Sequence, residues 1–116
     1  MRLSTIANIA GARFVAAGHI DPNIRAVCAA DLMSDVLAFA EPGCLLLTGL
    51  CNPQVIRTAE MADINAVMFV HGKAPTADTI ALAESKSIPL LSTSLSMFEV
   101  CGRLYQSQLA DEQNRS

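Results

Sequence analysis

Nine polar or glycine residues stand at the ends of apolar segments of this chain, where buried strands would finish. They are Asp31, Ser34, Thr48, Gly49, Asn52, His71, Gly72, Ser92 and Thr93. In an open parallel sheet, ligands bind beyond the carboxyl ends of the strands, where loops and helix N-termini meet. Helix N-termini carry free N–H groups and partial positive charge, which favour anions. The spacing therefore predicts a site for a small anionic ligand at this edge.

The same residues also have structural explanations. Asn52 precedes Pro53 as a helix cap would, and a proline is well tolerated at the first helical position. The two glycines would permit turns, the two residues Ser92 and Thr93 would satisfy backbone groups, and His71 would be a hydrogen-bonded group at a strand end. Residue types alone leave both interpretations open.

No catalytic constellation is found in the sequence. Gly72-Lys73 is followed by Ala74, whereas a phosphate-binding loop needs Ser or Thr there. Neither the dinucleotide-binding pattern G-x-G-x-x-G nor the nucleophile pattern G-x-S-x-G occurs. His19 and His71 lack metal-ligand spacing and have no obvious nucleophile beside them. We therefore expect a non-catalytic protein that carries no cofactor.

The four cysteines, Cys28, Cys44, Cys51 and Cys101, stand sixteen, seven and fifty residues apart. Structural zinc sites usually pair ligands two to four residues apart, and the ferredoxin spacings are also absent. Free cysteine behaves as a small, often buried hydrophobe. We expect core packing without metal or disulfides, with Cys51 the most exposed, and a cysteine-held cluster or enzyme as the less favoured alternative.

Three near-continuous apolar segments, each starting 22 residues after the previous one, are typical of parallel strands covered on both faces. They are residues 44–48, 66–70 and 88–92. A helix beginning after Asn52 follows the first segment. A second helix, with Thr76 as its cap and Ile80 and Ala81 facing inward, follows the next.

Ser96 and Glu99 form a capping box that predicts a last helix. Its apolar stripe is assigned to the core and comprises Met97, Phe98, Cys101, Leu104 and Tyr105. Upstream, the pattern predicts a helix over residues 3–10 ended by Gly11, strands over 13–17 and 24–29, and a helix through Val36 capped by Asp31 or Ser34.

These segments predict an α/β fold with a mostly parallel central sheet of about five strands and helices on both faces. A chain of 116 residues with 52% hydrophobic and 16% charged residues fits one domain, over residues 1–109, with a frayed polar tail at 110–116. The eight Lys and Arg are scattered and the net charge is −3, so nucleic acid is not an expected partner. No apolar run approaches the roughly 18–20 residues of a membrane span, and no secretory signal is found, so we expect a cytoplasmic protein.

The order and spacing of these segments resemble the DRTGG domain over residues 3–109. The resemblance rests on residues 46–49, 66–72 and 88–93, with support from 30–37 and 96–99. It implies a fold similar to the N-terminal domain of HPr serine kinase/phosphorylase. DRTGG domains also occur beside CBS domains in some pyrophosphatases and within some phosphotransacetylases, as regulatory or assembly modules. Where many members have Asp-Arg after Thr-Gly, this chain has Leu50-Cys51, so a ligand role carried by those two residues is not expected.

The resemblance and the polar edge together predict a non-catalytic regulatory module that senses a small anionic or nucleotide-like ligand. Stand-alone members are often encoded near iron-only hydrogenase subunits. The alternative is therefore an assembly or accessory protein for a redox enzyme of hydrogenase type, acting through protein contacts. The apolar helix over residues 97–105 predicts a homodimer.

Overall fold

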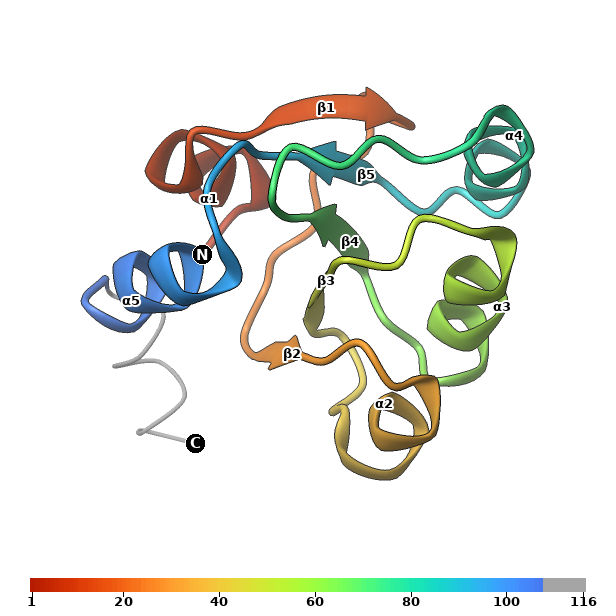
Figure 1. Cartoon of the computed structure of the whole chain (residues 1–116), viewed down its shortest axis with the longest axis horizontal. Coiled ribbons are helices and arrows are strands. Elements are labelled where there is room, and N and C mark those ends of the chain that lie inside the picture. Colours follow the sequence, from red (N-terminus) through yellow and green to blue (C-terminus); the bar gives the residue numbers. More distant parts are fainter. Residues whose placement is uncertain (108–116) are drawn as a thin grey trace.

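A five-stranded sheet forms the centre of the computed structural model, which describes residues 1–107 (Figure 1). The strands are β1 (Arg13–Ala16), β2 (Val27–Ala29), β3 (Leu45–Thr48), β4 (Ala66–Phe69) and β5 (Leu90–Ser92). Their order across the sheet is β1-β5-β4-β3-β2. Neighbours from β5 to β2 are parallel, and β1 pairs antiparallel with β5. The mostly parallel sheet is confirmed, and the reversed direction of β1 is new.

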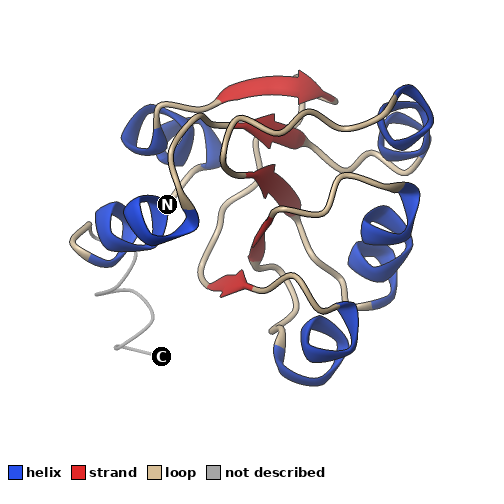
Figure 2. Ribbon diagram, in the orientation of Figure 1, coloured by secondary structure: helices blue, strands red, loops and turns tan. Residues whose placement is uncertain are grey.

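Helices cover both faces of the sheet, as predicted (Figure 2). They are α1 (Leu3–Ala10), α2 (Met33–Phe39), α3 (Pro53–Met61), α4 (Ala77–Ser85) and α5 (Met97–Tyr105). The crossover helices α2, α3 and α4 lie along one face, while α1 and α5 pack side by side on the other. Within residues 1–107 no helix is both long and apolar enough to cross a membrane. The predicted tail at 110–116 and the last two residues of the predicted domain lie outside the described residues.

The near-continuous apolar strands are explained by two separate cores. Leu45 and Leu47 of β3 are buried in the core beneath α1 and α5, whereas Leu46 is buried in the core beneath α2, α3 and α4. In β4, Met68 is buried in the core beneath α1 and α5, and Val67 is buried in the core beneath α2, α3 and α4. Successive side chains of a strand point to opposite faces, so a sheet covered twice needs apolar residues at every position.

Three predicted helix boundaries are confirmed by their hydrogen bonds. The Asn52 side-chain oxygen accepts from the backbone N–H of Gln54 at 3.1 Å, and the Ser96 hydroxyl accepts from that of Glu99 at 3.1 Å. Gly11 ends α1 with a φ of 60°, in the left-handed region that glycine adopts without strain.

The predicted start of α2 is wrong. Leu32 occupies its N-cap position and no side chain caps the helix, so neither Asp31 nor Ser34 has that role. Asp31 instead reaches across to the end of β3. A local pattern cannot distinguish a side chain that caps its own helix from one drawn to the neighbouring strand.

The predicted inner face of α4 is right for Ile80, which packs at the margin of the core, and wrong for Ala81. Thr79 and Ala83 are buried, whereas Ile80 is half-buried and Ala81 is exposed. Thr76 occupies the N-cap position of α4, as predicted, but its hydroxyl contacts the side chains of Asp78 and Thr79 and makes no capping bond to the backbone. Thr79 fits the inner face because its hydroxyl donates to the Cys51 carbonyl at 3.1 Å.

The apolar stripe of α5 is only partly buried. Val100 and Leu104 face the core, with Met97 and Cys101 packed at its margin, whereas Phe98 and Tyr105 are exposed. Contact with α1 fixes the rotation of the helix. Helical spacing shows that two aromatic residues share a face, but it does not show that this face is covered.

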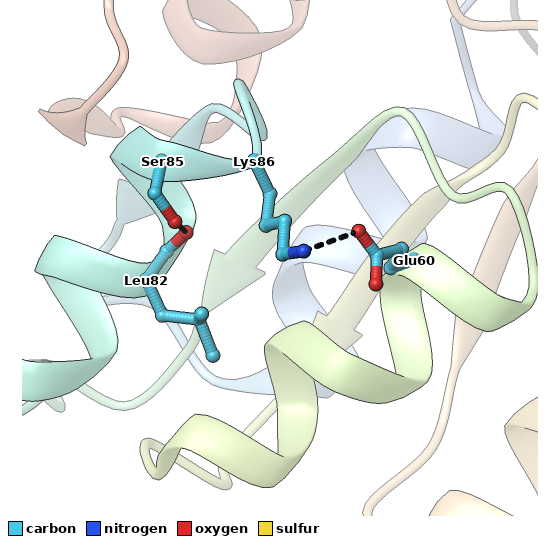
Figure 3. Close-up of polar contacts among 4 residues, drawn as sticks. All are labelled: Glu60, Leu82, Ser85 and Lys86. Carbon is cyan, nitrogen blue, oxygen red and sulfur yellow. Dashed lines mark hydrogen bonds and ion pairs between the residues drawn. The ribbon is translucent and has the colours of Figure 1, made fainter.

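Helices α3 and α4 run side by side and are joined near their C-terminal ends by an ion pair (Figure 3). The Lys86 ammonium lies 3.1 Å from the Glu60 carboxylate. Both side chains are about half exposed, so the pair adds little stability. In the last turn of α4 the Ser85 hydroxyl donates to the Leu82 carbonyl at 2.7 Å. A hollow of about 300 Å³ lies beside this pair, at the edge of the sheet opposite the predicted site.

Candidate functional site

The carboxyl ends of β2, β3, β4 and β5 meet at one edge of the sheet, because these strands are parallel. The amino end of β1 joins them, because β1 runs the other way beside β5. Arg13 pairs with Ser92 at that corner. The edge therefore collects four strand-to-helix loops and, in addition, the loop between α1 and β1.

Asp31 ties the end of β2 to the end of β3. Its Oδ1 atom accepts from the Thr48 hydroxyl at 3.1 Å and from the Gly49 backbone N–H at 2.8 Å. The Thr48 hydroxyl also accepts from the Leu50 N–H at 3.2 Å. Thr48 is fully buried, whereas Asp31 is exposed. Three of the predicted residues therefore form one hydrogen-bonded cluster.

Lys73 brings a positive charge to this cluster. A Cβ atom added to Gly49 would lie 3.5 Å from the Asp31 Oδ1 and 3.8 Å from the Lys73 Nζ, so both charges border the space above the glycine. Burial raises the pKa of the Cys51 thiol. The Lys73 charge has a smaller effect in the opposite direction and lowers that pKa. Lys73 was not among the nine predicted residues, although its place directly after Gly72 was a usable signal.

His71 and Gly72 form the centre of a tight turn after β4. Their φ angles are 62° and 69°, and the Lys73 N–H donates to the Val70 carbonyl at 3.3 Å. Positive φ at both central residues is the signature of a type I′ turn. The His71 and Gly72 N–H groups donate to the carbonyls of Leu95 and Thr93, each at 2.8 Å. The turn is thus fixed to the loop that follows β5, with the His71 side chain exposed.

Ser92 and Thr93 use their hydroxyls to hold backbone segments in place. The Ser92 hydroxyl donates to the Lys73 carbonyl at 2.9 Å. The buried Thr93 hydroxyl donates to the Ala10 carbonyl at 2.7 Å and accepts from the Leu95 N–H at 3.2 Å. These bonds support the structural interpretation of both residues.

A hollow of about 320 Å³ opens between the start of β1 and the end of β5. It is lined by Gly11, Ala12, Arg13, Gly72, Ser92, Thr93 and Ser94. The Arg13 side chain is exposed and makes no ion pair or hydrogen bond with another residue of the described chain. No local pattern pointed to Arg13, because its place beside this hollow depends on the antiparallel direction of β1.

Two predicted site residues belong neither to the cluster around Asp31 nor to the lining of the hollow beside Arg13. Asn52 is engaged as the cap of α3, and Ser34 is exposed on α2 without a hydrogen-bond partner among residues 1–107. Cys51, predicted to be the most exposed cysteine, is half-buried like Cys28 and Cys101, whereas Cys44 is buried. The Cys51 carbonyl accepts hydrogen bonds from Thr76 and Thr79 at the start of α4.

The cysteines are all free thiols, and burial raises the pKa of each. The effect is largest at Cys44, where burial raises the pKa to about 11. Within the described part of the chain, no group of three or more His, Cys, Asp or Glu residues could hold a metal ion.

Comparison with known proteins agrees with this architecture. The family model for the DRTGG domain matches residues 5–107. A similar solved structure is described as the CBS and DRTGG domains of the regulatory region of Clostridium perfringens pyrophosphatase complexed with its activator, diadenosine tetraphosphate. It is 16% identical, with a TM-score of 0.69 over 90% of this chain, which spans 46% of that chain. A search of curated proteins gave no significant match. The chain belongs to the DRTGG domain family.

Proposed function

We propose that this chain is a non-catalytic regulatory module that binds a small anionic or nucleotide-like ligand at the carboxyl edge of its sheet. The observation that carries the proposal is the hollow beside Arg13, whose guanidinium has no acidic partner among residues 1–107. An arginine without a partner offers a fork of N–H donors that matches a phosphate or carboxylate.

The remaining groups at the edge suit the same ligand class. The Ser94 hydroxyl lines the hollow and has no hydrogen-bond partner in the described residues, and Lys73 supplies a second positive charge at the neighbouring turn. Among residues 1–107, hydrogen bonds to the Asp31 carboxylate use only its Oδ1 atom, so Oδ2 can accept from a ligand hydroxyl, such as that of a ribose. A hollow of about 320 Å³ lies at the small end of ligand sites, and suits a phosphate group better than an entire dinucleotide.

The family supports a regulatory role for the ligand. The solved relative contains a DRTGG domain within a regulatory region and was crystallised with a nucleotide activator. An assembly role beside a redox enzyme stays a prediction from the resemblance, since no contact within residues 1–107 favours it. The cytoplasmic location also stays a prediction.

Thermal unfolding with added ligand tests the proposal. The probes are inorganic phosphate, AMP, ATP and diadenosine tetraphosphate, added to the 116-residue protein. A ligand at a hundred times its dissociation constant stabilises the folded state by about 2.7 kcal/mol. We expect at least one probe to raise the melting temperature, and Arg13→Gln to abolish that rise.

Arg25→Gln is the matched control, because Arg25 is also exposed but precedes β2 at the opposite edge of the sheet. It should leave the ligand-induced rise intact. The proposal is wrong if no probe stabilises the protein, or if the two arginine variants lose the response equally.

A further inference from the structure

An apolar face of α5 is left uncovered by the rest of the described chain. Phe98 and Tyr105 are 76% and 75% exposed, and they lie seven residues apart on the same side of the helix. With Cys101, Gly102 and Gln106 they line a hollow of about 400 Å³. Large aromatic side chains grouped on one exposed face mark a surface that binds another molecule.

The sequence of this face is nearly symmetrical about the bond between Cys101 and Gly102. Phe98 and Tyr105 stand at equal distances on either side, with the two small residues at the centre. A second α5 laid antiparallel across the first would pack Phe98 of each copy against Tyr105 of the other. Two-fold interfaces between identical chains require this self-complementarity, because a contact from residue i to residue j is repeated from j to i.

The charges on α5 fit the same arrangement. Glu99 and Arg103 lie on opposite sides of the centre, so an antiparallel copy brings each acid toward the base of the other helix. The Glu99 Oε1 atom contacts the Ser96 hydroxyl at 3.3 Å, and the Arg103 Nη1 donates to the Ile9 carbonyl at 3.1 Å. The second carboxylate oxygen and the remaining guanidinium N–H groups face no partner within α5 itself.

Gly102 is unexplained by the single chain. It lies inside α5, where glycine costs about 1 kcal/mol relative to alanine, and a Cβ atom there would meet nothing within 4 Å. Its φ is not positive, so the backbone does not demand glycine either. Close approach of another helix backbone is a remaining reason for glycine at an exposed position.

We propose that the α5 face, consisting of Phe98, Cys101, Gly102 and Tyr105, is a two-fold interface between two copies of this chain. The proposal is independent of the ligand site and gives the predicted homodimer a specific surface. One nine-residue helix offers less than the roughly 800 Å² per partner of a standard interface, so the dimer is weak and concentration-dependent.

Analytical ultracentrifugation of the 116-residue protein, from about 1 μM to about 1 mM, tests the interface because weak dimers dissociate within that range. We expect a monomer–dimer equilibrium that Phe98→Glu shifts to monomer at every concentration. Phe39→Glu is the matched control, since Phe39 is 77% exposed on α2, on the other side of the sheet. Melting curves should show that both variants fold.

A cross-linking experiment locates the two-fold axis. A short bis-maleimide forms a thioether with one cysteine of each copy, and Cys101 lies closest to the proposed axis. We expect the wild type to form a covalent dimer. The Cys101→Ser variant should not form it, whereas the Cys28→Ser and Cys51→Ser variants should. A wild-type monomer at all concentrations, an equal loss of dimer in both phenylalanine variants, or cross-linking that survives Cys101→Ser would overturn the proposal.

Discussion

The Asp31 carboxylate accepts a 2.8 Å hydrogen bond from the backbone N–H of Gly49, eighteen residues further along the chain. The contact links the carboxyl ends of two neighbouring parallel strands, β2 and β3. It also holds a carboxylate beside the loop from which Asn52 starts α3. The acid predicted as a helix cap therefore organises the edge at which we place the ligand site.

Replacing Asp31 with alanine should destabilise the protein by about 1 kcal/mol, because a hydrogen bond to an exposed charged group contributes modestly. Thr48 and Gly49 would lose their acceptor. Urea unfolding measures the change. Ser34→Ala is the control, since Ser34 is exposed and has no described partner, and it should be neutral. Equal stability of the two variants would contradict a structural role for Asp31.

The two buried threonines Thr93 and Thr58 should respond oppositely to valine, which has the same shape but no hydroxyl. Thr93, 2% exposed, bonds to Ala10 and Leu95. Thr93→Val leaves both backbone groups unpaired and should cost about 1–3 kcal/mol. Thr58 is 1% exposed and its hydroxyl has no hydrogen-bond partner in the described part of the chain, so Thr58→Val should be neutral or stabilising. Denaturant titrations of the two variants compare these costs, and similar values would refute the assignment.

Asp21 should make stability depend on pH. Hydrogen bonds from the Ser4 backbone N–H and hydroxyl, each 2.9 Å, lower its pKa below the ordinary value of 3.8. Because the folded pKa is the lower one, the contribution is complete above about pH 5 and is lost as pH falls through the unfolded and then the folded pKa.

Asp21→Asn should therefore lower the melting temperature at pH 7 and flatten its decline between about pH 5 and pH 2. Ser4→Ala removes only the hydroxyl contact and should have a smaller effect in the same direction. The test is to record the melting temperatures of the wild type and both variants across this pH range. A variant whose pH profile is parallel to that of the wild type would exclude Asp21 as the source.

Lys73→Met should slow the alkylation of Cys51. The Lys73 charge lowers the pKa of this thiol, so its removal raises the pKa and reduces the reactive thiolate fraction at pH 8. Iodoacetamide labelling followed by mass spectrometry measures the rate at each cysteine. Cys101 is the internal control, since burial alone raises its pKa and its rate should not change. An unchanged Cys51 rate would place Lys73 away from this thiol.

Local features of the sequence predicted most of the helices and strands. Asn52-Pro53 and the box formed by Ser96 and Glu99 predicted helix starts correctly, because a cap acts within a few residues. The apolar segments predicted parallel strands with two covered faces. Parallel strands bring their carboxyl ends together, and so the location of Asp31, Gly49 and Ser92 at one edge also followed.

The sequence by itself thus determined most of the helices and strands along the chain and the edge of the sheet that carries polar groups. Only the tertiary structure decided the direction of β1, which brings Arg13 to the hollow, and the rotation of α5, which exposes Phe98. It also decided that the Thr93 hydroxyl bonds to Ala10, 83 residues away. Periodicity specifies which residues share a face, but pairing between distant segments depends on contacts that exist only after the chain has folded.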